Sequence, residues 1–331
     1  MLYYYALLYY NINIKQIKTM KKIHIISTLI TILTFSTFAK ADLKVVTSIK
    51  PIHSLASYIM YGVGSPGLIV DGYNSPHSFQ LKPSHAKMLE QADIIFWIGE
   101  DLENFLEKPL DTIAKKAEKI ELLEIKDIKK LKFKERNIFD EHEGHDDHGH
   151  DAKKEEHDDH EGHGHGEYDP HIWLDPINAK VILNEITEHL IENDSKNAST
   201  YKSNLAKALA EIDKLIIDVI TETNTDLSYV VFHDAYQYYE NRFNVNILGA
   251  MTVNPDVMPG AEQIHEIHEV IEHDNVSCIL SEPQFNPDII KSIAKDTSVK
   301  TGVLDPLGAN LKPGKNLYFD LIRNMSSSFN C

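Results

Sequence analysis

The sequence predicts an α/β protein of two lobes, each a small, mainly parallel sheet flanked by helices, joined by one long helix. Three observations support this class. Apolar strand-like runs alternate with helical patterns in the first half of the chain, the same alternation returns in the second half, and one long amphipathic run separates the two. The 331 residues are enough for two domains of ordinary size.

The first residues carry the pattern of an export signal. Met20-Lys21-Lys22 is a charged start, residues 23–38 are a short apolar run, and Ala39-Lys40-Ala41 is a small-residue cleavage site. We therefore assign residues 1–41 to a signal peptide cleaved after Ala41. Translation is expected to begin at Met20, because residues 1–19 fit no part of the pattern; an unusually long charged region is the alternative. The apolar run is too short for a membrane span, so the mature protein is expected in the periplasm and not embedded in a membrane.

Residues 42–198 are expected to form the first lobe. Its predicted strands are short runs of apolar and β-branched residues at 43–49, 67–70, 93–98 and about 120–125. Its clearest predicted helices lie at 51–61, 83–91 and 177–191. Pro51 and Pro83 suit the first turn of two of these helices, because that turn leaves its N–H groups unpaired and proline has none.

One long helix is expected at residues 199–224, between the lobes. Ser199 can cap its amino end. Helical spacing places four apolar residues on one face: Leu205, Leu209, Ile212 and Ile216. Roughly 25 residues at 1.5 Å each give a rod of nearly 40 Å.

Residues 225–331 are expected to form the second lobe. Strands are predicted at 229–232, 245–248, 276–280 and 301–304. Helices are predicted at 235–243, 261–272, 287–295 and 315–329. Strand and helix therefore alternate as they do in the first lobe, which favours a second parallel sheet.

The formal charge of −17 is concentrated in one segment. Residues 140–169 contain thirteen acidic residues, two lysines and eight of the eighteen histidines. A strongly acidic chain is a poor non-specific binder of nucleic acid, because such binding needs a basic surface. The segment at about 140–167 has almost no apolar residues, so we expect a disordered loop.

The histidines of this loop form an internal repeat. Residues 141–150 (EHEGHDDHGH) resemble residues 156–165 (EHDDHEGHGH). Imidazole nitrogens bind zinc, and the neighbouring carboxylates attract cations. We expect weak auxiliary metal sites at His142, His145, His148, His150, His157, His160, His163 and His165. The alternative is that this segment is a solvated polar insertion that has no function.

Four other residues stand out as candidates for one metal site. His77 lies in the loop after the second predicted strand, and His171 lies in the sequence DPHIWLDP. His233 and Asp305 each follow the end of a predicted strand, where ligands gather in open α/β sheets. Three neutral imidazoles and one carboxylate suit tetrahedral Zn²⁺.

Four motifs give these residues a family context. They are PHSFQLKPS at 76–84, DPHIWL at 169–174, FHDAY at 232–236 and SEPQF at 281–285. Together they resemble the zinc-receptor proteins of bacterial ABC importers, the ZnuA type. The resemblance implies two lobes, a rigid connecting helix, one zinc ion between the lobes, and ligand roles for His77, His171 and His233.

The sequence alone does not determine which group is the fourth ligand of the metal. Zinc members of the family often have an acidic residue beside the first histidine, and here that neighbour is Pro76. Asp305, which matches a ligand of related manganese receptors, or a water molecule must complete the coordination. Manganese members generally have a carboxylate at the position of His233, so the imidazole there favours zinc.

The chain has two cysteines, Cys278 and Cys331. They are too few for a Cys-rich zinc module, and they could form one disulfide in an oxidising compartment. The resemblance implies the same pairing, because zinc members often pair two cysteines in the second lobe. Two buried free thiols are the alternative.

The expected function is a high-affinity zinc-binding receptor that delivers Zn²⁺ to the membrane permease of an ABC transporter. Such a protein makes and breaks no bonds, so it is not expected to be an enzyme, and it is expected to be a monomer. A manganese or iron receptor of the same family is the first alternative. A zinc hydrolase and a metal-binding adhesin are weaker ones, the hydrolase because three histidines and a water also describe a catalytic zinc site.

Overall fold

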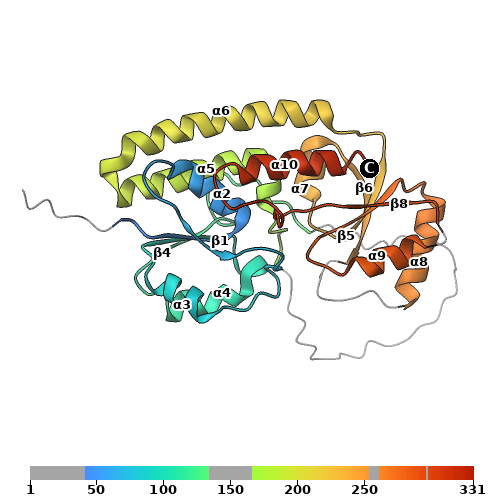
Figure 1. Ribbon diagram of the computed structural model, residues 1–331, viewed down its shortest axis with the longest axis horizontal. Coiled ribbons are helices and arrows are strands. Elements are labelled where there is room, and N and C mark those ends of the chain that lie inside the picture. Colours follow the sequence, from blue (N-terminus) through green and yellow to red (C-terminus); the bar gives the residue numbers. More distant parts are fainter. Residues whose placement is uncertain (1–41, 134–165, 253–260, 296) are drawn as a thin grey trace, which may run out of the picture. The chain divides into compact units, whose positions relative to one another are not determined.

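The computed structural model describes residues 42–133, 166–252, 261–295 and 297–331. In this part of the chain, two sheets of four parallel strands each are flanked by helices (Figure 1). This arrangement confirms the predicted fold class. The predicted signal peptide and the eight histidines of the acidic loop lie outside the described residues.

The first sheet has the strand order β2-β1-β3-β4. Its strands are β1 (Val45–Ile49), β2 (Gly67–Val70), β3 (Ile94–Trp97) and β4 (Glu118–Glu121). The helices between them are α2 (Lys50–Ile59), α3 (Pro83–Glu90) and α4 (Glu100–Thr112). Strands β1 and β3 are buried along their whole length, as expected for parallel strands with both faces covered. The order of connection reverses between these two strands, which is where α/β sheets open a binding crevice.

The second sheet repeats this topology with the order β6-β5-β7-β8. Its strands are β5 (Ser228–His233), β6 (Asn246–Thr252), β7 (Cys278–Ser281) and β8 (Lys300–Val303). The helices are α7 (Gln237–Phe243), α8 (Ala261–His273) and α9 (Pro287–Ala294). The reversal now lies between β5 and β7, so a crevice is expected at their carboxyl ends.

The remaining elements connect the two sheets. They are the 3₁₀ turns η1 (Ile172–Leu174) and η2 (Ser195–Asn197), and the helices α5 (Pro176–Asn193), α6 (Ala198–Glu222) and α10 (Leu317–Ser328). Asp175 caps α5, since its carboxylate accepts the N–H of Ile177 at 2.9 Å. Helix α6 is the long helix predicted between the lobes, and it packs against α2, α5 and α10.

The predicted cap of the long helix, Ser199, was wrong by two residues. Ser199 lies inside the first turn of α6, and Asn197 occupies the cap position. Turn η2 leads straight into the helix, and the carboxylate of Asp194 accepts hydrogen bonds from Asn197 and Tyr201 there. These two bonds tie the turn to the first helical residues, so no serine cap is needed.

The buried face of α6 is also shifted from the predicted one. The buried residues are Tyr201, Asn204, Ala208, Ile212, Leu215 and Val219. The other three predicted apolar positions are only partly buried beside this face: Leu205, Leu209 and Ile216. The shift is possible because Asn204, a polar residue, donates its amide hydrogens to the carbonyls of Ile59 and Tyr61 at 2.9 Å each.

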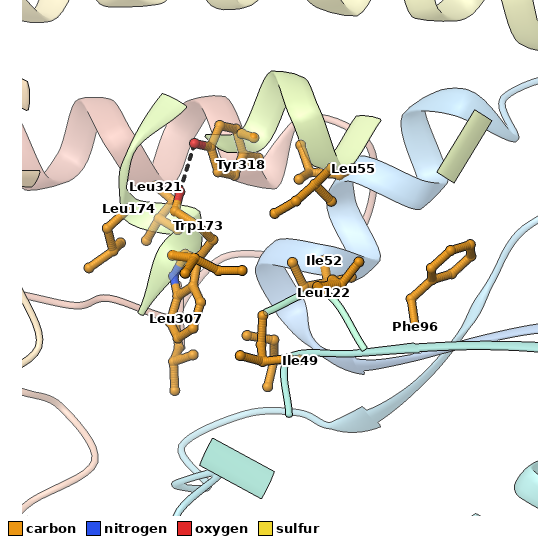
Figure 2. Packing of buried hydrophobic residues seen from close by; sticks show 14 of the residues in the cluster. Ile49, Ile52, Leu55, Phe96, Leu122, Trp173, Leu174, Leu307, Tyr318 and Leu321 are labelled. Carbon is orange, nitrogen blue, oxygen red and sulfur yellow. Dashed lines mark hydrogen bonds between the residues drawn. The ribbon is translucent and has the colours of Figure 1, made fainter. Parts of the chain in front are cut away.

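The last helix completes the core of the first half of the chain. Tyr318 of α10 donates its hydroxyl to the carbonyl of Trp173 at 2.8 Å, and its N–H to the hydroxyl of Ser54 in α2 at 2.9 Å. Figure 2 shows Tyr318 and Trp173 packed with Ile52 and Leu55 in this cluster. Helix α10 follows the second sheet in sequence, yet it packs on α2 and α6. The exact lobe boundaries stay a prediction.

Two further features bear on the sequence-based predictions. Cys278, at the start of β7, forms a disulfide with Cys331, with 6.4 Å between their Cα atoms. The predicted pairing is therefore present.

Among the described residues, no helix combines the length and the hydropathy needed to cross a bilayer.

Candidate metal centre

The three predicted histidine ligands come together in the folded chain. His77 belongs to the loop between β2 and α3, His171 immediately precedes η1, and His233 is the last residue of β5. The ring of His77 lies 5.7 Å from that of His171 and 5.1 Å from that of His233, and the other two rings are 5.1 Å apart. One nitrogen from each ring lies within 4.8 Å of the other two. Ligand atoms around tetrahedral zinc are about 3.3 Å apart at bonds of about 2.0–2.1 Å, so small side-chain rotations would seat one ion.

His171 is held in place by the carboxylate two residues before it. Asp169 is fully buried, and its Oδ1 accepts the backbone N–H of His171 at 2.9 Å. The same oxygen lies 2.6 Å from the ring Nδ1. An ionised carboxylate can only accept, so Nδ1 carries the hydrogen and the lone pair of Nε2 is left for a metal.

His233 has an equivalent carboxylate partner from the neighbouring strand. Its Nδ1 lies 3.2 Å from Oε1 of Glu282, the residue that follows β7. The same oxygen accepts the hydroxyl of Tyr236 at 3.0 Å. Burial lowers the pKa of His233, but the carboxylates of Glu282, Asp234 and Asp169, with Glu282 contributing most, together leave it raised. His233 and Glu282 thus stand on either side of the reversal between β5 and β7.

His77 is the most accessible of the three. It is half-buried, whereas only 3% of the surface of His171 and of His233 is exposed. Its backbone N–H donates to the hydroxyl of Ser75 at 3.2 Å within a loop that contains both exposed and buried residues. The ring nevertheless faces a mainly apolar cavity that also includes Trp173 and Phe285. Apolar walls limit access of water and strengthen the attraction between an ion and its ligands.

The structure does not bring Asp305 into the histidine cluster. The residue lies two positions beyond β8, and its carboxylate accepts the backbone N–H groups of Leu307, Gly308 and Ala309 at 3.1, 2.9 and 2.6 Å. Burial raises the pKa of Asp305, and these three donors oppose the rise. The carboxylate therefore shapes the loop that brings Leu307 to the cavity wall. Its role as fourth ligand stays a prediction.

Two residues of this centre were given no role by the sequence reasoning. Asp169 and Glu282 lie within the motifs at 169–174 and 281–285, yet neither was assigned. Metal-binding histidines usually donate their second nitrogen to a carboxylate or carbonyl. That rule could have pointed to Asp169, which is two residues from His171. Glu282 is 49 residues from His233 and is its neighbour only because β5 pairs with β7.

Fold and site together define a class. The chain has two parallel α/β sheets, and three imidazoles converge among the segments that connect their elements. This is the architecture of a two-lobed, metal-binding solute receptor.

Comparison with known proteins gives the family. Residues 45–330 match the model of the family described as "ZnuA: Zinc-uptake complex component A periplasmic", and the chain belongs to this family. A relative from Brucella abortus (strain 2308), named "High-affinity zinc uptake system protein ZnuA", is 44% identical over 304 residues, which is 86% of this chain and 90% of the relative. A relative of the same name from Yersinia pestis is 36% identical, with 88% of this chain and 92% of the relative covered. The family resemblance inferred from the four motifs is thereby confirmed.

Solved structures share the fold. "Crystal structure of ZnuA" superposes with a TM-score of 0.69 at 21% identity, covering 87% of this chain and 99% of that one. "Structure of the SBP FpvC from pseudomonas aeruginosa in complex with Mn2+" has a TM-score of 0.70 at 17% identity, covering 87% and 98%. At these identities the superpositions support the fold and not the choice of metal.

Proposed function

We propose that this protein is a high-affinity zinc receptor of the periplasm that delivers Zn²⁺ to the membrane permease of an ABC importer. The observation that carries the proposal is the convergence of His77, His171 and His233 from three distant parts of the chain. Relatives at 44% and 36% identity that are named for high-affinity zinc uptake support it. Members of this family are solute receptors, so the site is expected to hold its ion and not to process a substrate.

The ligand set favours zinc over manganese. Three imidazole nitrogens suit Zn²⁺, whereas Mn²⁺ prefers oxygen ligands. The carboxylates of Asp169 and Glu282 contact the rings and not the expected ion position, so they orient the ligands and offset the charge of the ion. A fourth ligand, either Asp305 or a water molecule, completes the tetrahedron.

We assign metal exchange to the loop that carries His77. His171 and His233 are buried and held by carboxylates, whereas His77 is half-buried on the loop between β2 and α3. The long helix α6 packs along α2, α5 and α10, which restricts large movements of the lobes. Opening of the His77 loop would remove one ligand and expose the ion.

The other unconfirmed parts of the assignment belong to the same proposal. The protein acts as a monomer after cleavage behind Ala41. The histidine-rich segment at about 140–167 collects additional zinc ions at weaker sites. Its affinity is lower than that of the interlobe site, because a loop without fixed structure loses conformational entropy when it closes around an ion.

Competition with a chelator of known zinc affinity tests the proposal. Residues 42–331 are compared with the same protein lacking residues 140–165, and each is compared with its His171→Ala variant. We expect one tight site in both forms, and a weakening by about 100-fold in His171→Ala, because a structural zinc site derives about 3 kcal/mol from each ligand. A tight site that survives His171→Ala, or micromolar Mn²⁺ that displaces the zinc, would contradict it.

A further inference from the structure

A second group of metal-ligating side chains lies at the other end of the first sheet. Glu118 is the first residue of β4, an edge strand, and His189 and Glu192 belong to the last two turns of α5. One ligand atom from each of the three lies within 4.8 Å of the other two. Helix α5 begins beside η1, and thirteen residues at 1.5 Å each place His189 about 20 Å further along it. The group is therefore separate from the interlobe histidines.

The imidazole of His189 has a carboxylate at each nitrogen. Nδ1 lies 2.9 Å from Oε1 of Glu118, and Nε2 lies 3.2 Å from Oε1 of Glu185, one helical turn earlier. A neutral imidazole has one N–H, so it can donate to only one of them. Nδ1 is buried and makes no hydrogen bond of acceptable geometry to a described residue, although the carboxylate is close. The contact of 2.9 Å is shorter than the roughly 3.3 Å between two ligand atoms of tetrahedral zinc, so a small rotation of either side chain would admit an ion between them.

The Glu118 carboxylate is itself oriented by the end of α5. Its second oxygen, Oε2, accepts the side-chain amide of Asn193 at 2.9 Å, and the same amide donates to the carbonyl of His189 at 3.0 Å. Glu118 therefore faces His189 with one oxygen while the other is occupied. Support of this kind around a ligand is typical of protein metal sites.

The surroundings of this group carry an excess of negative charge, which a bound cation would offset. Three glutamates meet here: Glu118, Glu185 and Glu192. The carboxyl end of a helix adds partial negative charge, which basic residues usually offset, but the last turn of α5 contains none. Within the described ranges, no lysine or arginine forms a salt bridge with any of the three glutamates.

We propose that Glu118, His189 and Glu192 form a second divalent-cation site, which takes Zn²⁺ with one nitrogen and two or more oxygen ligands. With an ion at Nδ1, the ring keeps its hydrogen on Nε2, where Glu185 accepts it and orients the imidazole. The site is more exposed and richer in oxygen than the interlobe site, so it binds zinc more weakly and discriminates less against Mn²⁺. An ion there would link the edge strand β4 to the end of α5. The proposal stands on this geometry alone and does not depend on the proposed transport role.

Anomalous scattering locates such an ion directly. Crystals of residues 42–331 grown with excess ZnCl₂ are measured on both sides of the zinc absorption edge. We expect one peak among the interlobe histidines and a second within about 2.0–2.2 Å of ligand atoms of His189, Glu118 and Glu192. The absence of the second peak when the first is present overturns the second site and leaves the proposed function untouched.

A solution titration shows whether the site exists outside a crystal. Backbone amide NMR signals of residues 117–119 and 188–193 are followed as ZnCl₂ is added beyond the first equivalent. His189→Ala should weaken the zinc-dependent shifts of these signals at least tenfold. Glu188→Gln is the matched control, because Glu188 is an exposed carboxylate on the same helix outside the group, and it should change the affinity less than twofold. Equal shifts in His189→Ala and the unaltered protein would overturn the proposal.

Discussion

The substitution Glu103→Gln should remove a loss of stability that the unaltered protein undergoes as the pH rises to neutrality. Glu103 lies in the first turn of α4, the helix that follows β3, and is completely buried. Its Oε2 accepts the backbone N–H groups of Ile98 and Gly99 at 2.7 and 3.3 Å, whereas Oε1 has no hydrogen-bond partner in the described part of the chain. Burial raises the pKa of Glu103 from 4.5 to about 7, and the nearby hydroxyl of Ser48 and the two N–H donors oppose the rise only in part.

The size of the effect follows from linkage. Between its unfolded and folded pKa values, Glu103 is ionised in the unfolded chain and protonated in the folded one. The folded state then binds the extra proton, so the free energy of unfolding decreases as pH rises, by about 1.4 kcal/mol per pH unit. From pH 4.5 to about 7 this amounts to about 3 kcal/mol, and above pH 7 the loss stays constant. Glutamine keeps the acceptor oxygen for both N–H groups and cannot ionise, so it avoids this loss.

Urea unfolding measured between pH 4 and 8 is the assay. EDTA is present throughout, so that metal binding does not contribute. The stability of Glu103→Gln relative to the unaltered protein should be flat below pH 4.5, rise by about 3 kcal/mol up to pH 7, and be flat again beyond. Glu188→Gln, on an exposed face of α5, is the control and should follow the unaltered protein at every pH. Parallel profiles for Glu103→Gln and the unaltered protein would refute the reasoning.

Three further predictions concern the metal centre and the disulfide. Asp169→Asn should weaken zinc binding by about 10-fold to 100-fold in a chelator competition, because the amide orients the His171 ring less firmly; an unchanged affinity would show that Asp169 has no such role. Zinc affinity should decrease as pH falls, since the imidazoles must lose their protons to bind. Glu282→Gln should move that decrease to lower pH in a pH series of the same competition, because it removes the charge that keeps the pKa of His233 raised, and an unshifted profile would contradict this. Cys331→Ser should lower the free energy of unfolding by about 4 kcal/mol under oxidising conditions, as the disulfide closes a loop with a sequence separation of 53 residues; the difference should disappear with a reductant in both samples.

The sequence predicts local features of this fold well and long-range ones poorly. The strand at Gly67–Val70 is found as predicted, because a loop ending in proline precedes it and an exposed aspartate follows it. The start of α6 was missed, since the helix begins through a 3₁₀ turn held by Asp194 and not through a serine cap. The buried face of α6 was shifted because Asn204 has partners that lie over 140 residues away in the chain.

In the metal centre, too, the sequence predicts local features better than contacts between distant residues. His77, His171 and His233 could be chosen because strand ends and motifs mark them locally. The partnership of His233 with Glu282 depends on the pairing of β5 with β7, which no local pattern reports. Asp305 has the residue type and the position after a strand that a ligand needs. Its carboxylate nevertheless faces three backbone N–H groups, and only the conformation of the loop at 305–309 reveals this.

The packing of α10 has a consequence for the order of events in biosynthesis. Ser54 and Trp173 both receive bonds from Tyr318, which is among the last fifteen residues of the chain. A nascent polypeptide that still lacks α10 cannot cover this part of its interior. Cooperative folding of the packed core must therefore wait until α10 has been synthesised, although 264 residues separate Tyr318 from Ser54 in the sequence.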